Sequence, residues 1–209
     1  MCTCTTPLIC GSKVFQRSCK GAAFLLRYAD DFVCGFGRDE EAQRYYRELE
    51  ERLQKFGLEL AAAKTRVIPF SRYRQGESSF DFLGFEFRWG TDRKGQARLQ
   101  RCTSRKKFRN SVKRVAEWCK KNRHRRVGEQ FKLLNAKLRG YYNYYGVRGN
   151  YASLNEFFQQ VQRLHLKWLN RRSQRQSYNW AGYRTLLQHF ALARPRIVGR
   201  PKPSLVASG

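Results

Sequence analysis

The sequence predicts an α+β fold, with short strands in the first half of the chain and amphipathic helices in the second. Up to about residue 98, apolar residues come in short runs broken by Asp, Gly and Pro, a pattern typical of hairpins. From Ser104 onward they recur every three to four residues, which is typical of helices. The charge changes at the same place: residues 101–209 carry 26 Lys and Arg against 3 acids, whereas residues 1–100 carry 17 against 13.

The strand half begins with a predicted tight β-hairpin over residues 24–36, which read FLLRYADDFVCGF. Two apolar runs flank Tyr28, Ala29, Asp30 and Asp31, and Asp favours the turn between strands. Two adjacent carboxylates repel unless a cation or a proton lies between them. Their hard oxygens suit Mg²⁺, and such a site could transfer a phosphoryl or nucleotidyl group by a two-metal mechanism. An ordinary solvated Asp-Asp turn is the alternative.

A helix is expected after the hairpin. Acidic residues at 39–41 favour its first turn, and Gly57 is expected to end it. Its apolar stripe consists of Ala42, Tyr45, Tyr46, Leu49, Leu53 and Phe56. An amphipathic helix needs a surface to cover, and the sheet that carries the Asp pair is the nearest candidate. An edge strand over residues 66–70 and a Phe-rich strand over 80–87, with a bulge after Gly84, complete the strand half.

The second half predicts three or four amphipathic helices in a small bundle. The first starts after Ser104 and places Phe108, Val112, Val115 and Cys119 on one face. The next runs over 127–145 and is broken by Gly146 and Gly149. A third is expected over 151–175 and a shorter fourth near 180–193, followed by a flexible tail.

The composition indicates a polyanion partner, because a net charge of +27 far exceeds what solubility requires. The seven cysteines are odd in number and irregularly spaced, which disfavours a disulfide scaffold and also a zinc site, for which C-x-x-C pairs are typical. Reduced thiols indicate a cytoplasmic location. We expect no membrane association, because no apolar run reaches transmembrane length and no signal peptide is recognisable.

The sequence Tyr28-Ala29-Asp30-Asp31 within its apolar flanks resembles the catalytic hairpin of reverse transcriptases, and more narrowly that of the reverse transcriptase/maturases encoded in group II introns. The later Lys64-Thr65 pair and FDFLGF at 80–85 resemble the end of that family's palm. The stretch LNAKLRGYYNYYG at 134–146 resembles its thumb, the maturase-specific domain X. The resemblance covers about residues 21–198.

The resemblance implies a partial reverse-transcriptase palm, made of β-hairpins and a helix, followed by an α-helical thumb bundle. The expected boundaries are a disordered or unrelated leader at 1–20, the C-terminal part of the palm at 21–98, the thumb at 99–198 and a flexible tail at 199–209.

The implied function is RNA-directed DNA synthesis together with maturase activity in intron splicing and mobility. Catalysis and the binding of two Mg²⁺ ions are assigned to Asp30 and Asp31, and Tyr28, Ala29 and Lys64 are placed near the nucleotide. The expected partners are group II intron RNA and an RNA template with a DNA primer. The expected RNA contacts are Arg105, Lys106, Lys107, Arg109, Lys113, Lys132, Lys137, Arg139 and Tyr142. For the tyrosines of residues 141–145, packing within the bundle is the alternative to stacking on unpaired bases.

The sequence departs from the family before the hairpin. The family's third catalytic carboxylate, its fingers and a Gly-rich template-contacting segment all precede it, whereas the first Asp of this chain is Asp30. The metal site is therefore expected to be incomplete and the isolated chain inactive, with the missing N-terminal part as a further partner. Two alternatives stay open: a non-catalytic, intron-RNA-binding maturase module, and a gene relic without function.

Overall fold

The computed structural model describes residues 19–29, 31–59, 61, 65–73, 78–92, 94–172 and 177–198. It divides into two compact units, Met1–Leu83 with Trp89–Arg98 and Gly84–Arg88 with Leu99–Gly209. Five helices and two small antiparallel sheets lie within the described residues, so the predicted α+β class is confirmed. The expected leader at 1–20 falls almost wholly outside the described residues, as does the tail at 199–209.

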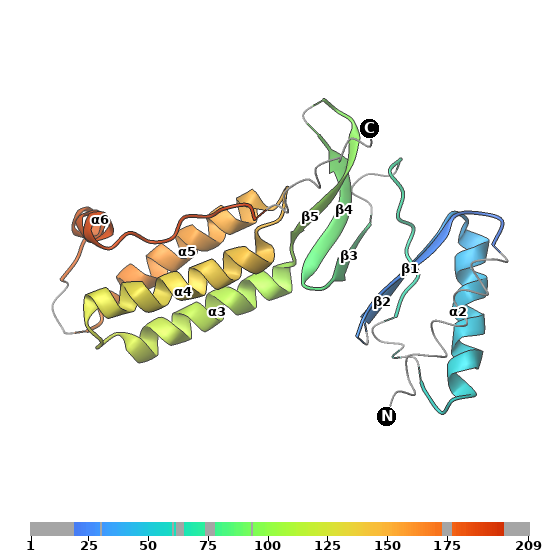
Figure 1. Cartoon of the computed structure of the whole chain (residues 1–209), viewed down its shortest axis with the longest axis horizontal. Coiled ribbons are helices and arrows are strands. Elements are labelled where there is room, and N and C mark those ends of the chain that lie inside the picture. The colour runs from blue at the N-terminus through green and yellow to red at the C-terminus, as the bar shows by residue number, and fades with distance from the viewer. Residues whose placement is uncertain are drawn as a thin grey trace, which may run out of the picture. The chain divides into compact units, whose positions relative to one another are not determined.

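A two-stranded hairpin and one helix form the first part of the chain (Figure 1). Strands β1 (Ala23–Tyr28) and β2 (Asp31–Phe36) pair in antiparallel register. Helix α2 (Asp39–Gln54) packs on β2 through Tyr45, Leu49 and Leu53, as its apolar stripe predicts. Gly57 follows the helix at φ +66°, a left-handed conformation that glycine adopts readily, so its predicted role at the helix end is confirmed.

The second sheet has the order β3-β4-β5, with strands β3 (Ser79–Phe82), β4 (Phe85–Thr91) and β5 (Ala97–Thr103). The predicted bulge after Gly84 is wrong. Leu83 and Gly84 have φ of +51° and +77°, and two consecutive left-handed residues make the tight turn of a hairpin instead. Strand β5 was not predicted, because the sequence AxLxRxT has only one large apolar residue to mark it.

The expected edge strand over residues 66–70 is also wrong, since this segment has no strand pairing. Pro69 cannot donate to a ladder. The segment contributes side chains instead: the Phe70 ring meets Phe80 edge-on at 5.0 Å and lies 5.9 Å from Trp89.

Four helices follow: α3 (Arg105–Asn122), α4 (Val127–Tyr145), α5 (Tyr151–Leu169) and α6 (Trp180–His189). Helices α3, α4 and α5 lie side by side, and α6 lies across one end (Figure 1). The bounds of α4 match the prediction, whereas α5 and α6 are shorter than expected. Asn170 follows α5, where its side chain accepts from the Tyr178 amide at 2.8 Å and donates to the Tyr178 carbonyl at 2.6 Å, which redirects the chain.

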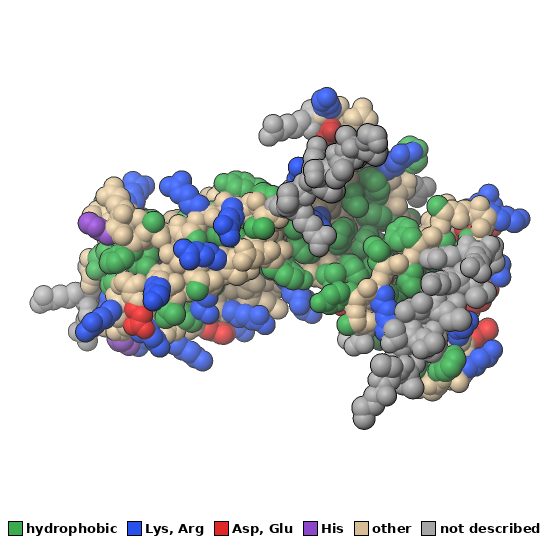
Figure 2. Space-filling model, viewed as in Figure 1, with side chains coloured by type: hydrophobic (Ala, Val, Ile, Leu, Met, Phe, Trp, Pro, Cys, Tyr) green, Lys and Arg blue, Asp and Glu red, His purple; other side chains and the backbone are tan. Residues whose placement is uncertain are grey.

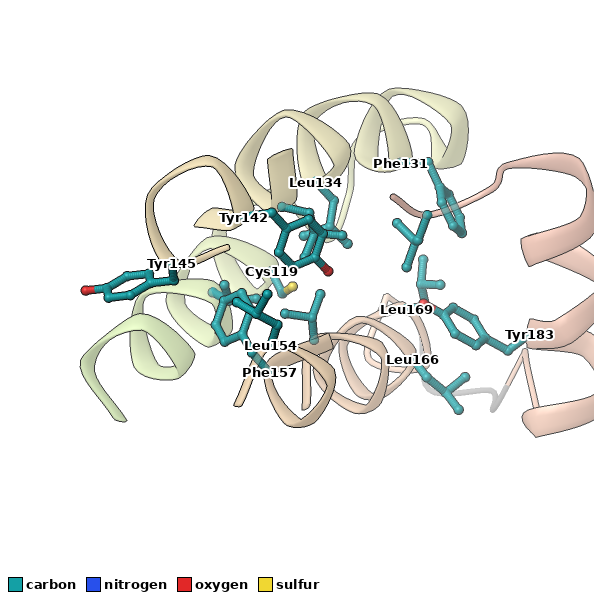
Figure 3. Close-up of a cluster of buried hydrophobic side chains, with 14 of the residues drawn as sticks. Cys119, Phe131, Leu134, Tyr142, Tyr145, Leu154, Phe157, Leu166, Leu169 and Tyr183 are labelled. Carbon is teal, nitrogen blue, oxygen red and sulfur yellow. The ribbon is translucent and has the colours of Figure 1, made fainter. Parts of the chain in front are cut away.

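The main core lies among these helices and comprises fifteen buried residues of the described part of the chain (Figure 3). Cys119 of α3, Leu134 and Tyr142 of α4, and Leu154 of α5 meet at its centre. Buried Asn150 joins the end of β5 to the α4–α5 connection: it accepts from the Thr103 amide at 2.9 Å and donates to the Tyr145 carbonyl at 2.8 Å. No helix of the described residues is long and apolar enough to cross a membrane.

Candidate catalytic hairpin and nucleic-acid interface

The predicted hairpin is present, with Tyr28 opposite Asp31 as its closing pair. The connection between the two strands is therefore two residues long, and its first residue, Ala29, has φ +52°. Asp30 itself lies outside the described residues, so the structure supplies the position of only one of the two predicted carboxylates. Arg27 stabilises the turn, because its Nε donates to the Ala29 carbonyl at 2.7 Å. This role of Arg27 was not predicted from the sequence. The only sign of it there is that Arg27 directly precedes Tyr28-Ala29-Asp30-Asp31.

The two faces of the hairpin differ sharply. Phe32, Cys34 and Phe36 face α2 and form a small core with it. The opposite face carries Phe24, Leu26 and Tyr28, which are 53%, 55% and 65% exposed, and Asp31 shares this face through its pairing with Tyr28. The Asp31 carboxylate is therefore next to exposed apolar and aromatic side chains. Among the described residues, this is a large apolar surface with the acid at its edge.

Gly35 shapes that exposed face. It pairs with Phe24, and a Cβ on Gly35 would lie 2.2 Å from the Phe24 ring. The ring can lie against the backbone of β2 only because residue 35 has no side chain. Beneath the opposite face, burial raises the pKa of the Cys34 thiol to about 11, so it is a neutral thiol at physiological pH.

The carboxylates of the hairpin are the type of ligand that Mg²⁺ prefers, but they are too few to complete a two-metal site. Asp31 is exposed and offers carboxylate oxygens, and Asp30 adjoins it in the sequence. Within the described part of the chain, no three His, Cys, Asp or Glu side chains come together as a metal-binding group. A pair of carboxylates could hold part of a two-metal site, and further ligands would have to come from elsewhere. The residues placed near the nucleotide are only partly described: Tyr28 and Ala29 are exposed at the turn, and Lys64 lies outside the described residues.

The basic residues predicted to contact RNA are all exposed, and they are divided between two helices. The set on α3 is Arg105, Lys106, Lys107, Arg109 and Lys113, and the set on α4 is Lys132, Lys137 and Arg139. Ser104 caps α3 by accepting from the Lys107 amide, so the cationic first turn is a regular helix end. The Lys137 ammonium lies 5.5 Å from the centre of the Trp118 ring, which orders that side chain.

The predicted RNA contact of Tyr142 is wrong. Tyr142 is 0% exposed in the main core, where no nucleotide can stack on it. In the run of four tyrosines, positions 142 and 145 follow the buried stripe of α4, whereas Tyr144 is 54% exposed. The Tyr144 ring stacks on Phe85 of β4 at 5.8 Å, and the Arg101 guanidinium lies 5.3 Å from the Phe85 ring. The exposed aromatic of this run is therefore Tyr144.

Comparison with known proteins bears on the first part of the chain. No curated protein matches the chain. Residues 9–87 match the family model described as "Reverse transcriptase (RNA-dependent DNA polymerase)". The matched segment contains β1, β2, α2 and β3, and therefore the Asp30-Asp31 hairpin. The match supports reverse transcriptase activity in general, with the nucleic-acid template and primer as the partners that such a domain implies.

Proposed function

We propose that the chain provides the catalytic hairpin and the thumb of an RNA-directed DNA polymerase of the group II intron type. The observation that carries this proposal is the two-residue turn closed by Tyr28 and Asp31, inside the segment that matches reverse transcriptases. The basic helices α3 and α4 support the second part, because their exposed cations can neutralise phosphates without reading sequence. The maturase role rests on the resemblance of residues 134–146 to domain X.

In this proposal Asp30 and Asp31 would hold Mg²⁺, and the ion would supply charge stabilisation when a primer 3′-hydroxyl attacks the α-phosphate of a nucleoside triphosphate and pyrophosphate leaves. Arg27 holds the turn in place through the Ala29 carbonyl. Tyr28 presents an exposed ring beside Asp31, on the same face of the hairpin. Two aspartates are too few for a two-metal site, so we propose that a third carboxylate comes from a further palm segment and that the 209 residues alone are inactive.

A primer-extension assay with an RNA template tests the catalytic assignment. The 209-residue chain should give no product at any Mg²⁺ concentration, and an added N-terminal reverse-transcriptase segment should restore synthesis. In the reconstituted enzyme, Asp30→Ala or Asp31→Ala should reduce synthesis to background, whereas the exposed Asp81→Ala on β3 should not. Extension by the reconstituted Asp31→Ala enzyme would contradict the assignment of the metal ligands, and extension by the lone chain would contradict its incompleteness.

A binding assay tests the thumb. Affinity for structured RNA should fall steeply with salt, and replacing Lys106, Lys107, Arg109 and Lys113 together with Gln should reduce the slope of log K against log salt by roughly 0.7–0.9 for each lost phosphate contact. Binding that does not change with salt would contradict this part of the proposal.

A non-catalytic maturase module in the cytoplasm is the second candidate, favoured by the separate and extensive core of the helical half. It predicts stimulation of intron splicing by the Asp30→Ala, Asp31→Ala double variant. A polymerase-only protein would leave splicing unchanged, and a gene relic would neither bind intron RNA nor support synthesis.

A further inference from the structure

Arginines from two distant segments meet at one end of the helical bundle. Arg123, Arg125 and Arg126 lie in the turn between α3 and α4, and Arg171 and Arg172 follow the last residue of α5. Figure 1 shows this turn and the C-terminal end of α5 at the same end of the bundle, and Figure 2 shows Lys and Arg side chains around that end. None of these arginines belongs to the set predicted from the sequence to contact RNA.

Contacts within the bundle hold three of the guanidinium groups in place. Those of Arg123 and Arg171 lie 6.0 Å and 5.3 Å from the centre of the Trp168 ring. Arg172 donates from Nη2 to the Arg125 carbonyl at 3.2 Å, which ties the end of α5 to the turn. Arg123 also donates from Nε to Nε2 of His124 at 2.9 Å. Stacking on an aromatic ring leaves the remaining in-plane N–H donors available, and those donors match phosphate geometry.

The turn beneath these arginines is fixed by a buried polar network. Gln130 of α4 donates from Nε2 to the carbonyls of Arg123 at 3.1 Å and Arg125 at 2.8 Å. Its Oε1 is then left to accept from Nε2 of His165, at 3.3 Å. The other ring nitrogen of His165 accepts from the Tyr183 hydroxyl at 3.0 Å. Helices α4, α5 and α6 therefore determine the shape of the arginine-bearing turn together.

The local charge is far from balanced. Residues 120–132 contain six Lys and Arg with a single acid, Glu129, which forms an ion pair with Arg125. Residues 163–172 contain four Lys and Arg and no acid. Ordering several like charges at one place costs free energy unless a polyanion binds there. A nucleic-acid backbone carries a phosphate at every nucleotide, so it can contact several cations that are spread over a surface.

We propose that Arg123, Arg171 and Arg172 form a preorganised phosphate-binding surface for the RNA backbone; this rests on the proposed RNA-binding function. The 18 residues of α3 separate it by about 27 Å from the cations at the helix N-terminus. The RNA therefore makes two separate contacts with the bundle. The second contact depends on the fixed orientation of the arginines as well as on their charge.

Three variants of the 209-residue chain test this against a double-stranded RNA of about 30 base pairs, long enough to reach both contacts, with circular dichroism and thermal melting as folding controls. The first replaces Arg123, Arg171 and Arg172 with Gln. The second replaces the same three with Lys, which keeps the charge but not the planar donors. The third replaces Arg148, Arg194 and Arg196 with Gln and removes equal charge from exposed positions outside these two charged segments.

The Gln variant at the proposed surface should bind at least roughly tenfold more weakly at low salt, with a salt slope smaller by about two to three. The Lys variant should recover the slope but not the affinity, and the charge-matched variant should bind within about threefold of wild type. Single Arg171→Gln, at an exposed position, should show the same trend if the triple variant folds poorly. Full recovery with Lys, or equal losses in the two Gln variants, would overturn the proposal.

The test also separates this inference from the proposed function. If wild type binds RNA and only the replacement of Lys106, Lys107, Arg109 and Lys113 weakens it, the arginine surface is refuted while the function stands. If wild type binds no RNA at all, the proposed function fails first. If the arginine variant loses binding to phosphatidylserine vesicles but not to RNA, the nucleic-acid assignment of the surface is refuted.

Discussion

The hairpin with α2 and the helical bundle α3–α6 differ in how much of their apolar surface they bury. The hairpin core has three buried residues, all from α2, and β1 leaves Phe24, Leu26 and Tyr28 more than half exposed. The main core has fifteen buried residues, of which α4 and α5 contribute five each. The bundle thus has a core of its own, whereas one face of the candidate catalytic hairpin has no cover among the described residues.

In the proposed function, this difference separates the part that carries the chemistry from the part that binds RNA. The carboxylate of Asp31 lies on the thinly packed part, and the exposed cations that we predict to contact RNA lie on the well-packed part. A rigid bundle suits phosphate binding, because the cations keep their spacing without a partner. Among the described residues nothing covers the apolar face of the hairpin, and the activity that we propose for the hairpin should depend on what covers this face.

Leu154→Ala in the bundle is expected to have the largest effect on stability. Leu154 is fully buried, so the loss of its methyl groups should lower the free energy of unfolding by about 2–5 kcal/mol. Leu26→Ala, at a 55% exposed position on β1, should cost less than about 1 kcal/mol. Urea unfolding followed by the fluorescence of Trp118 and Trp168 measures the first, and far-UV circular dichroism the second. Equal costs would contradict the difference in burial.

The pH dependence of the bundle gives the next largest effect. Burial lowers the pKa of His165 from 6.5 to about 4, because the charged form would lose its hydration. The unfolded state therefore binds a proton that the folded state does not, and stability should fall as the pH drops from about 7 to about 4. The loss attributable to this residue is about 3 kcal/mol.

Comparison with His165→Gln isolates that contribution. The variant lacks the titrating group, so its stability should depend less on pH than that of the wild type over the same range. Urea unfolding at several pH values measures the difference. Parallel pH profiles for the two proteins would show that the His165 proton is not responsible.

The periodicity of apolar residues made the helices predictable. Residues with unusual backbone angles and buried polar contacts were not predictable from the sequence. The stripe of α4 gave its bounds, because apolar residues at three- and four-residue steps leave little choice of structure. The same stripe should have excluded Tyr142 as an RNA contact, but four tyrosines within five residues obscured which of them face inward. The turn at Leu83 was missed because leucine rarely adopts φ +51°.

The candidate site was partly predictable for a different reason. The Asp-Asp turn has a short sequence motif, and its hairpin register follows from the apolar runs on either side. The arginine surface has no such motif. It forms only when α5 brings Arg171 and Trp168 to the α3–α4 turn, and Gln130 fixes that turn through contacts 5 to 35 residues away. Contacts of that kind depend on tertiary packing, which a single sequence does not reveal.

Ala29→Gly is expected to have the smallest effect on stability. It tests whether the backbone strain at Ala29 matters to the hairpin. Ala29 adopts φ +52°, a conformation that costs an L-residue roughly 1–2 kcal/mol, and glycine relieves most of that cost. Glycine also gains entropy in the unfolded chain, worth roughly 0.5–1 kcal/mol in the opposite direction. The net change should be a stabilisation below about 1 kcal/mol, measurable as a small rise in the unfolding midpoint.

Gly57→Ala is the matched control for Ala29→Gly. Gly57 has φ +66°, and no atom lies within 4 Å of the position that a Cβ would occupy. Alanine there adds backbone strain without a steric clash and should destabilise the hairpin unit by about 1 kcal/mol. Strain retained at a functional turn holds neighbouring groups in place. Ala29→Gly should therefore lower primer extension in the reconstituted enzyme despite its higher stability. A variant that is both more stable and fully active would show that the strained turn does not position Asp30 and Asp31.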